Sequence, residues 1–572
     1  MPVTVHFDRF YLYAELTEIL QAFAAEYPHL ASLESIGKSY EGRDIWCMTI
    51  TNRATGAPED KPAMYIDANI HAGEVTGSAV ALYTINHLLT NFGRDEEVDY
   101  LLNNRTFYIL PRVNPDGAEK YLTTPYLLRS SVRPYPYPES EIADRPGLHP
   151  EDIDGDGRIL MMRVRDDERG EWKPSDKDPR LMVKRRPHEK GGPFYRLYPE
   201  GFVKDYDGEP FDVVATPWGL DINRNFPAEW SPRQQGAGPY PLSEPETRAL
   251  AEFIVGHPNI AGVQAYHTTG GVIYRPFCTR PDSEMDPEDL RAFKEIGQLG
   301  TDILGYECIH AYFPGGRGPA GRAGIFIDWV YVHRGLIAYT TELWDILGRA
   351  VGREEKGGHY DPVTKWDDKK REEVELKILA WNDKHLGGRG FIDWHAFDHP
   401  QLGPVELGGW DIKYCRQNPP PEFLEEECRK NCQFTLQHAA ALPQLHLQDV
   451  EVEPLGERTF RLRARVYNSG YLATSVTNQA RKVKACRPDR VELKLPDGWS
   501  LLTGQHSMEL GFLDGFMAGQ KRQFYRYGTP SRSAAKVEWV IQTDGTAGAV
   551  TVQAVSERAG RVVRTVRVPA EA

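Results

Sequence analysis

Two histidines and a glutamate are placed where they could bind one metal ion. His71 and Glu74 follow the apolar run PAMYIDANI, and His267 ends a second apolar run, GVQAYH. Because strand ends are rigid and the turns after them face the crevice above a sheet, residues at two such ends can converge on one ion. Two His and one Glu match the open three-ligand set of a catalytic zinc. Each residue alone is more often part of a hydrogen-bonded loop or core, so the zinc prediction depends on all three together.

A single carboxylate lies near the end of another apolar run. In GLIAYTTELWD, residues 335–345, the only residues before the end of the run that are not apolar are two threonines and Glu342. A buried carboxylate that faces a water molecule beside zinc is a suitable general base. Pairing of Glu342 with an arginine is the alternative that the residues leave open.

The segment GLDINRNFP, residues 219–227, carries polar side chains suited to binding a carboxylate. Arg224 can grip a carboxylate through two hydrogen bonds, and Asn223 can add its amide. Asp221 could hold the second ring nitrogen of a histidine that binds metal. Without the zinc set, a polar turn closed by Asx hydrogen bonds would be the preferred interpretation.

A cluster of acidic residues resembles the start of a calcium loop. Asp152, Asp154 and Asp156 alternate with small residues in DIDGDG, but loop position twelve, which needs a bidentate acid, holds Arg163. A calcium site and a solvated acidic turn are both compatible with this pattern.

The elements that must position these residues alternate between strands and helices. Strand-like runs occur at 44–50, 62–70, 105–113, 260–267 and 335–342, and helical stretches at 10–27, 78–92, 243–255 and 287–304. This alternation predicts an α/β sandwich with a parallel or mixed sheet. Ser243 and Asp286, each followed closely by a proline, are predicted to cap two of the helices.

The pattern changes twice along the chain. Residues 134–218 are rich in Pro, Gly, Asp and Arg with little periodicity, which predicts a large surface insertion at the mouth of the site. From residue 446 onward, short alternating runs separated by turn signals such as Asn468-Ser469-Gly470 predict a β-sandwich. We therefore predict a catalytic domain over 1–445, with the insertion inside it, and a β-sandwich domain over 446–572.

Composition narrows the class of protein further. The chain has 572 residues and a net charge of −14 that is spread along its length, which argues against nucleic acid or an anionic membrane as the main partner. The sequence does not open with a basic segment followed by an apolar run, and no apolar stretch is long enough to span a membrane. Seven scattered cysteines indicate reduced thiols. A cytoplasmic location is the expectation.

The order of the motifs resembles a known family. His-x-x-Glu is followed by Asn-Pro-Asp-Gly at 114–117, Asp-x-Asn-Arg-Asn, a histidine at a strand end, Ile-Asp-Trp at 327–329 and Thr-x-Glu-Leu-x-Asp. This series resembles the zinc carboxypeptidases related to carboxypeptidase A over residues 10–345 and a closing helix near 422–440. The resemblance implies a mixed eight-stranded sheet sandwiched by helices.

The resemblance also implies roles for individual residues. His71, Glu74 and His267 would hold one Zn²⁺ ion, and Glu342 would activate the attacking water. Asn223 and Arg224 would grip the free C-terminal carboxylate of a peptide substrate, and Asp221 would support the first ligand. Two roles come from the resemblance alone: Arg129 would stabilise charge on the scissile carbonyl, and Ile327 would form the floor of the pocket for the last side chain. An apolar floor weakly favours an apolar or aromatic C-terminal residue.

Three features depart from the family pattern. The family often has an arginine between the first two ligands, whereas this chain has Gly73, so a contact upstream of the cleaved bond is expected to be missing. The position of the family's mobile tyrosine holds Ala320, and Tyr312 is a candidate replacement across a shifted loop. The insertion at 134–218 is much longer than the corresponding link in the family.

Two other functions fit the same motifs. An amidase that acts on N-acyl amino acids or cell-wall peptides would use the same metal set but release a different product. A non-catalytic binding protein of carboxypeptidase type, whose β domain docks an unidentified partner, would normally lack a ligand or the base, and this chain retains all four residues.

Overall fold

The computed structural model describes residues 3–208, 210–312, 322–352, 366–520, 522–523, 526–527 and 531–570. Its centre is a mixed eight-stranded sheet, as the resemblance implies. In spatial order the strands are β1 (Ala31–Lys38), β2 (Asp44–Ile50), β4 (Thr106–Leu110), β3 (Ala63–Ala68), β11 (Ile260–Thr268), β14 (Ile337–Leu343), β12 (Val272–Arg275) and β13 (Glu307–His310). The three strands that precede or carry the candidate site residues, β3, β11 and β14, are parallel neighbours in the middle of the sheet.

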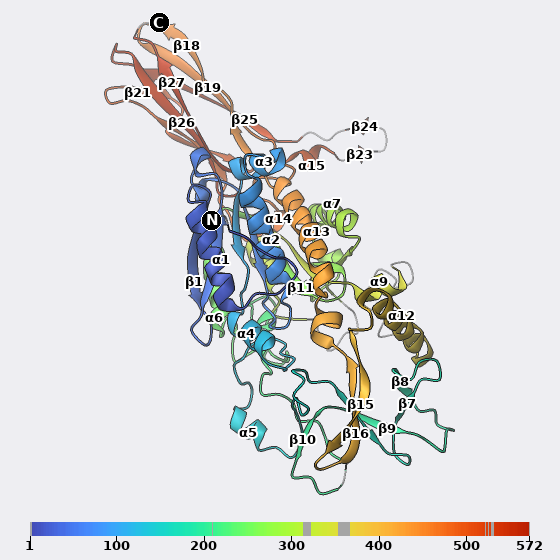
Figure 1. Cartoon of the computed structure of the whole chain (residues 1–572). Coiled ribbons are helices and arrows are strands. Elements are labelled where there is room, and N and C mark those ends of the chain that lie inside the picture. Colours follow the sequence, from blue (N-terminus) through green and yellow to red (C-terminus); the bar gives the residue numbers. More distant parts are fainter. Residues whose placement is uncertain are drawn as a thin grey trace.

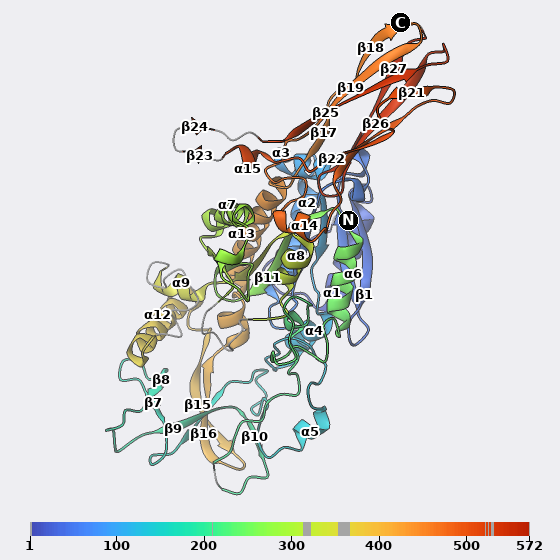
Figure 2. The same ribbon diagram turned by 180° about the vertical axis from the view of Figure 1, so that it is seen from behind.

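Helices cover both faces of the central sheet. One face packs against α1 (Tyr13–Glu26), α2 (Thr76–Asn91), α3 (Glu96–Asn104), α7 (Pro287–Leu304) and α13 (Pro421–Ala440), and the other against α6 (Pro245–Gly256) and α8 (Phe326–Arg334). Figure 1 is seen from the side of α2 and α13, and Figure 2 from the side of α6 and α8. Successive residues of β3 point to opposite faces: Met64 and Ile66 join the first core, and Ala63 and Tyr65 join the second. The predicted α/β sandwich is confirmed.

The two predicted helix caps had different outcomes. Asp286 caps α7, because its side chain accepts hydrogen bonds from the backbone amides of Glu288 and Asp289. The Ser243 cap is wrong: α6 begins at Pro245 with Glu244 as its N-cap. The hydroxyl of Ser243 instead donates to the Glu244 carboxylate at 2.7 Å.

The 134–218 insertion is more regular than its composition predicts. It contains α5 (Glu139–Ala143) and the strands β5 (Gly147–Pro150), β6 (Met161–Arg165), β7 (Trp172–Pro174), β8 (Met182–Lys184), β9 (Tyr195–Pro199) and β10 (Gly201–Lys204). Four of these strands join β15 (Phe391–His399) and β16 (Gly403–Trp410) in one six-stranded sheet, in which β6 pairs with β16. Arg163 fixes this pairing through two hydrogen bonds to Glu406, each 2.9 Å long. We call this sheet, with the flanking residues of segments 134–218 and 366–418, the β lobe.

Two helices connect the central sheet to the second segment of the β lobe. They are α9 (Ile346–Val351) and α12 (Asp368–Leu386), and they pack on each other around Trp344 and Trp381. A short helix, α4 (Pro115–Thr123), lies beside the lobe at the end of the central sheet.

Residues beyond 444 form two packed β-sheets. The first contains β17 (Leu445–Leu447), β18 (Glu451–Gly456), β19 (Thr459–Asn468), β21 (Ser500–Thr503) and β25 (Ala534–Gln542), and the second β20 (Asp489–Lys494), β22 (Ser507–Gly511), β26 (Gly548–Ser556) and β27 (Gly560–Val568). Their facing side chains, including Leu462 and Trp539 from one sheet and Val491 and Val552 from the other, share one core. These sheets are the all-β region that the alternating pattern predicts, and we call them the sandwich. Short elements at its base are α14 (Asn478–Lys482), α15 (Phe516–Gly519), β23 (Arg522–Gln523) and β24 (Arg526–Tyr527).

The sandwich and the β lobe lie at opposite ends of the central layer (Figures 1 and 2). The sandwich docks through the buried Arg558, which donates to the carbonyl oxygens of Arg334 at 2.6 Å and Gly335 at 3.3 Å. Gly335 precedes β14, whereas Glu342 lies at the far end of that strand. The sandwich therefore contacts the edge of the sheet opposite the candidate site. Among the described residues, no helix has the length and apolar character needed to cross a membrane.

Candidate active site

His71, Glu74 and His267 converge at the carboxyl ends of β3 and β11. The Nδ1 atoms of the two histidines are 3.0 Å apart, and each lies 2.9 Å from an oxygen of Glu74. All three residues are buried, and their ligand atoms lie within 4.8 Å of one another. Two imidazole nitrogens that face each other across one carboxylate are the donor set expected around a single cation, so these residues fit a zinc ion.

Asp221 and Arg129 surround this cluster. Asp221 lies 3.1 Å from Nε2 of His71, the ring nitrogen that does not face Glu74, which is where a carboxylate would fix the tautomer of a metal-binding histidine. Arg129 donates to Glu74 at 2.7 Å and to Asp221 at 3.3 Å, while its side chain stays 51% exposed. Burial alone would raise the pKa of Asp221, but the charges of Arg224, Arg129 and His71 outweigh it and hold the pKa well below its usual range.

A network of buried asparagines shapes the turn that carries the first two ligands. Asn69, at a positive φ of 60° that asparagine tolerates, donates to the carbonyl oxygens of His71 at 2.6 Å and Ala72 at 3.2 Å. Asn114 donates to the carbonyl oxygens of Ile70 and Ser130. The Asn-Pro-Asp-Gly motif therefore ties the turn to the segment that follows Arg129.

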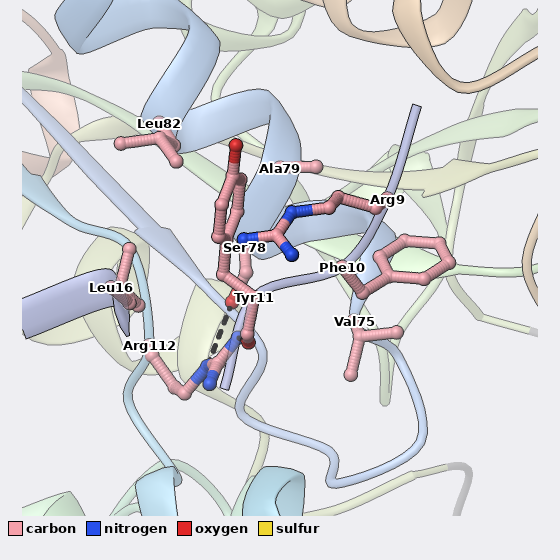
Figure 3. A pocket seen from close by; sticks show the side chains of 9 residues that line it. All are labelled: Arg9, Phe10, Tyr11, Leu16, Val75, Ser78, Ala79, Leu82 and Arg112. Atoms are coloured by element: carbon pink, nitrogen blue, oxygen red, sulfur yellow. Dashed lines mark hydrogen bonds between the residues drawn. The ribbon is translucent and has the colours of Figure 1, made fainter. Parts of the chain in front are cut away.

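Arg112 ties the same turn to the N-terminal segment, in a small cavity shown in Figure 3. Its Nε donates to the Ser78 hydroxyl at 3.2 Å, and its Nη2 donates to the carbonyl oxygen of Tyr11 at 2.8 Å. Ser78 in turn donates to Asn69 at 3.1 Å. This chain of hydrogen bonds fixes the metal-binding turn against the N-terminal segment.

Glu342 lies beside His267 because β11 and β14 are parallel and in register. The two residues are paired across the strands, and Glu342 is the only residue of β14 that is not buried. Removal from bulk water and the nearby Glu74 carboxylate raise the pKa of Glu342, the charge of Arg129 opposes both, and together they bring the pKa to about 8. Among the described residues, none forms a salt bridge with Glu342. The alternative that Glu342 pairs with an arginine therefore has no support in this part of the chain.

Asn223 and Arg224 lie in a short 3₁₀ turn, Ile222–Arg224, that Asp221 caps. The side-chain oxygen of Asn223 accepts a hydrogen bond from the amide of Phe326 at 2.9 Å. Arg224 donates to the carbonyl oxygen of Asn223 at 2.7 Å and lies 3.9 Å from Asp221, which leaves much of its guanidinium for another acceptor. The sequence left two interpretations of this segment, a turn closed by Asx hydrogen bonds and a site that binds a carboxylate. The two are compatible, because Asp221 closes the turn and Arg224 extends from it.

The residues predicted for the specificity pocket are only partly described. Ile327, in the first turn of α8, is 1% exposed and is packed in the core on that face of the sheet. Ala320, at the position of the family's mobile tyrosine, lies outside the described residues. Tyr312 follows β13 with its ring 6.4 Å from that of His310, and its proposed role stays a prediction.

Sequence reasoning missed the residues that fill the space beside Gly73. A Cβ atom on Gly73 would lie 2.8 Å from the amide of Gln417 and 2.8 Å from the ring of Tyr121. The next residue, Asn418, donates to the carbonyl oxygen of Gly73 at 2.8 Å and accepts from the amide of Thr76 at 3.2 Å. No local signal could have revealed these contacts, because 345 residues separate Asn418 from Gly73.

The acidic cluster in the insertion forms a turn closed by hydrogen bonds. Asp152 accepts from the amides of Gly155 and Gly157, and Asp154 accepts from the amide of Asp156. Asp154 and Asp156 also face His395 and Arg158. These contacts favour the solvated acidic turn over a calcium site.

Comparison with known proteins finds relatives among the carboxypeptidases. A family model described as zinc carboxypeptidase matches residues 16–348, and a second model, described as a domain of unknown function, matches residues 444–567. Carboxypeptidase A2 of Rattus norvegicus is 25% identical over 341 residues, which cover 57% of this chain and 60% of that protein. Carboxypeptidase D of Homo sapiens is 36% identical over 108 residues, which cover 19% of this chain and 8% of that protein. The matches therefore span less than two thirds of the length of these relatives.

Solved structures also align with the chain. Carboxypeptidase A from Helicoverpa armigera has a TM-score of 0.41 and 18% identity, with coverage of 67% of this chain and 74% of that one. A structure of thrombin activatable fibrinolysis inhibitor has a TM-score of 0.41 and 16% identity, with coverage of 76% of this chain and 74% of that one.

Proposed function

The chain belongs to the zinc carboxypeptidase family, and we propose that it removes the C-terminal residue from peptides that end in a free carboxylate. The observation that carries the proposal is the convergence of His71, Glu74 and His267, with Glu342 paired beside His267 across the strands. A metal-binding cluster with an adjacent carboxylate at one edge of a sheet is an arrangement suited to hydrolysis of an amide bond.

His71, Glu74 and His267 would hold the zinc ion, which when bound supplies a Lewis acid that polarises a carbonyl group and lowers the pKa of water. Asp221 would keep the ring of His71 oriented, because it lies 3.1 Å from the nitrogen that does not face the cluster.

Glu342 would accept a proton from the attacking water and return it to the leaving amine. A group that must both take and give a proton works best when its pKa is near the working pH, and the surroundings of Glu342 raise its pKa to about 8. Its partial exposure at the end of β14 gives it access to water.

Arg129 and Arg224 would each interact with a different negatively charged group of the substrate. Arg224, with Asn223, would bind the terminal carboxylate and so position the last peptide bond for attack. Arg129 is half exposed beside Glu74, and its outer face would stabilise the charge that develops on the carbonyl oxygen.

The test is product analysis with blocked dipeptides that have free C-termini. Protein loaded with zinc is expected to release the free C-terminal amino acid, a chelator is expected to stop the release, and added zinc is expected to restore it. Release of a deacylated amino acid instead would point to an amidase. Absence of any hydrolysis by zinc-loaded protein would contradict an enzymatic role at this site.

A further inference from the structure

The small cavity beside the N-terminal segment contains a buried arginine with one unpaired nitrogen. Arg112 is 4% exposed, and it uses Nε to contact the hydroxyl of Ser78 and Nη2 to contact the carbonyl oxygen of Tyr11. Its third nitrogen, Nη1, is buried and has no hydrogen-bond partner among the described residues. Because a buried donor without an acceptor is costly, Nη1 indicates an acceptor that this part of the chain does not supply.

The charge of Arg112 also lacks a counter-charge in contact with it. Among the described residues no carboxylate forms a salt bridge with Arg112, and the two whose charges act on it, Glu119 and Glu15, are engaged elsewhere. Glu119 accepts from the amide of Tyr13 at 2.8 Å, and Glu15 pairs with Arg9 at 2.6 Å. Burial lowers the pKa of Arg112, these more distant charges oppose the change, and together they bring the pKa to about 10. A water molecule could satisfy Nη1, but only an anion would also balance the buried charge.

The residues that line the cavity favour an anion over a cation. Two arginines, Arg9 and Arg112, are among them, and no acidic residue is (Figure 3). The guanidinium of Arg9 lies over the ring of Tyr11, 4.4 Å from its centre, while Arg112 contacts the backbone of the same residue. The side chain of Arg9 is 52% exposed, so it can adjust to an occupant, whereas that of Arg112 is held in place. Two positive charges without a lining carboxylate create a positive potential in the cavity.

The volume of the cavity limits the anion to a small one. It is about 10 Å³, which is room for roughly one sphere the size of a water molecule. Phosphate and sulfate have five heavy atoms and would collide with the apolar side chains of the wall, which include Phe10, Val75 and Leu82. Chloride is a single atom only slightly larger than a water molecule, so it fits both the charge and the space.

We propose that Arg112 and Arg9 bind a chloride ion in this cavity, and that the ion stabilises the metal-binding turn. The ion would fix the guanidinium of Arg112 in the orientation in which Nε reaches Ser78. Ser78 donates to Asn69, and Asn69 donates to the carbonyl oxygen of His71. A chain of hydrogen bonds therefore connects the proposed anion site to the first proposed zinc ligand. The anion site itself does not depend on the proposed carboxypeptidase function.

The first measurement is thermal unfolding of the zinc-loaded protein while chloride replaces gluconate at constant ionic strength. An ion that binds only the folded protein raises Tm as its concentration rises, and we expect a rise of about 2 °C or more. Sulfate at the same ionic strength is too large for the cavity and should not produce the rise. A Tm that depends on ionic strength and not on the identity of the anion would overturn the proposal.

Variants assign the rise to the cavity. R112Q removes the charge together with Nη1 and is expected to lose the chloride-dependent rise, whereas chloride bound at the zinc ion would still act on it. R53Q is the matched control, because Arg53 is an exposed arginine that donates to Ser32 at 2.6 Å, and it should keep the full rise. If R112Q does not fold, A79V fills the cavity while both arginines remain, and it should also lose the rise. An undiminished rise in either folded variant would overturn the proposal.

Bromide locates the ion directly in crystals of the native protein. Bromide replaces chloride and scatters X-rays anomalously, so a peak is expected in the anomalous difference map in contact with Nη1 of Arg112. A water molecule there without an anomalous peak, or peaks only at other arginines, would overturn the chloride site.

Zinc affinity tests the connection to the metal-binding turn. Replacing gluconate by chloride is expected to tighten zinc binding by about fivefold in the native protein and to have no such effect in R112Q. Because both proteins are measured in the same buffers, any complex between zinc and chloride in solution cancels. Equal effects of chloride on the two proteins would overturn the connection to the turn, whereas the bromide peak decides the anion site separately.

Discussion

The β lobe and the sandwich are both built from strands, but they attach to the central sheet at opposite edges and in different ways. The lobe is assembled from two segments that interrupt the catalytic part of the chain, and its last residues reach the metal-binding turn through Asn418. The sandwich is one continuous segment that contacts the far edge through Arg558. We therefore expect changes in the lobe to alter the chemistry, and changes in the sandwich to alter only stability.

The largest effect is expected at the edge of the sheet that faces the lobe. E342Q should retain zinc but lower kcat by about 10²–10⁴-fold, because the proton acceptor is lost while all three ligands remain. Metal content and kcat measured on the same preparation check this. E307Q, an exposed glutamate on β13, is the control and should keep full activity. Turnover of E342Q close to that of the native protein would remove Glu342 from the mechanism.

Arg224 is expected to have the next largest effect, through the terminal carboxylate. Amidation of the peptide removes the charge that Arg224 pairs with, so kcat/KM should fall by roughly a hundredfold. R224A should weaken cleavage of the free acid strongly but cleavage of the amide much less. The two-by-two comparison of protein and substrate measures this coupling. Equal cleavage of free and amidated peptides by the native protein would show that Arg224 is not a carboxylate clamp.

Asn418 tests whether the lobe supports the site. N418A leaves the carbonyl oxygen of Gly73 and the amide of Thr76 without their side-chain partner, so the turn between the first two ligands should loosen. We expect kcat/KM or zinc affinity to fall by about tenfold. R165Q changes an exposed lobe residue paired with Asp167 and should have no effect. Native kinetics and native zinc affinity in N418A would mean that the lobe does not support the metal-binding turn.

Arg558 gives the smallest kinetic effect and completes the comparison. R558M removes hydrogen bonds to four backbone carbonyl groups, those of Arg334, Gly335, Ser475 and Ala485. Unsatisfied buried carbonyl groups should lower the free energy of unfolding by about 1–3 kcal/mol, while kcat/KM stays unchanged. Thermal unfolding and kinetics on one sample measure both. R561Q, which removes side-chain contacts with Asp60 and Gln553, should be nearly neutral. A large loss of kcat/KM in folded R558M would contradict the separation of the two regions.

The sequence predicted the central sheet better than the β lobe, for a physical reason. His71, His267 and Glu342 each end an apolar run, and parallel strands bring their ends to one edge, so local pattern was enough to place them together. The helix capped by Asp286 was equally local, whereas Ser243 is drawn into contacts with Glu244 and Asn225 instead of capping.

The lobe depends on contacts that no local pattern encodes. Arg163 and Glu406 pair across 243 residues, and the periodicity of β6 and β16, strands of five and eight residues, is weak when each is taken alone. The contact between Gln417 and Gly73 is also long-range. The presence of glycine at position 73 gave no indication that Gln417 fills the space beside it. Long-range pairing therefore had to come from the structure.

The most direct test of the account is a zinc titration of metal-free protein, with bound metal and release of the C-terminal amino acid followed together. We predict that activity rises in proportion to bound zinc and saturates at one ion per chain, and that H267A neither retains the ion nor recovers activity. Full activity in metal-free protein, or native zinc binding and native activity in H267A, would contradict a single zinc centre at His71, Glu74 and His267.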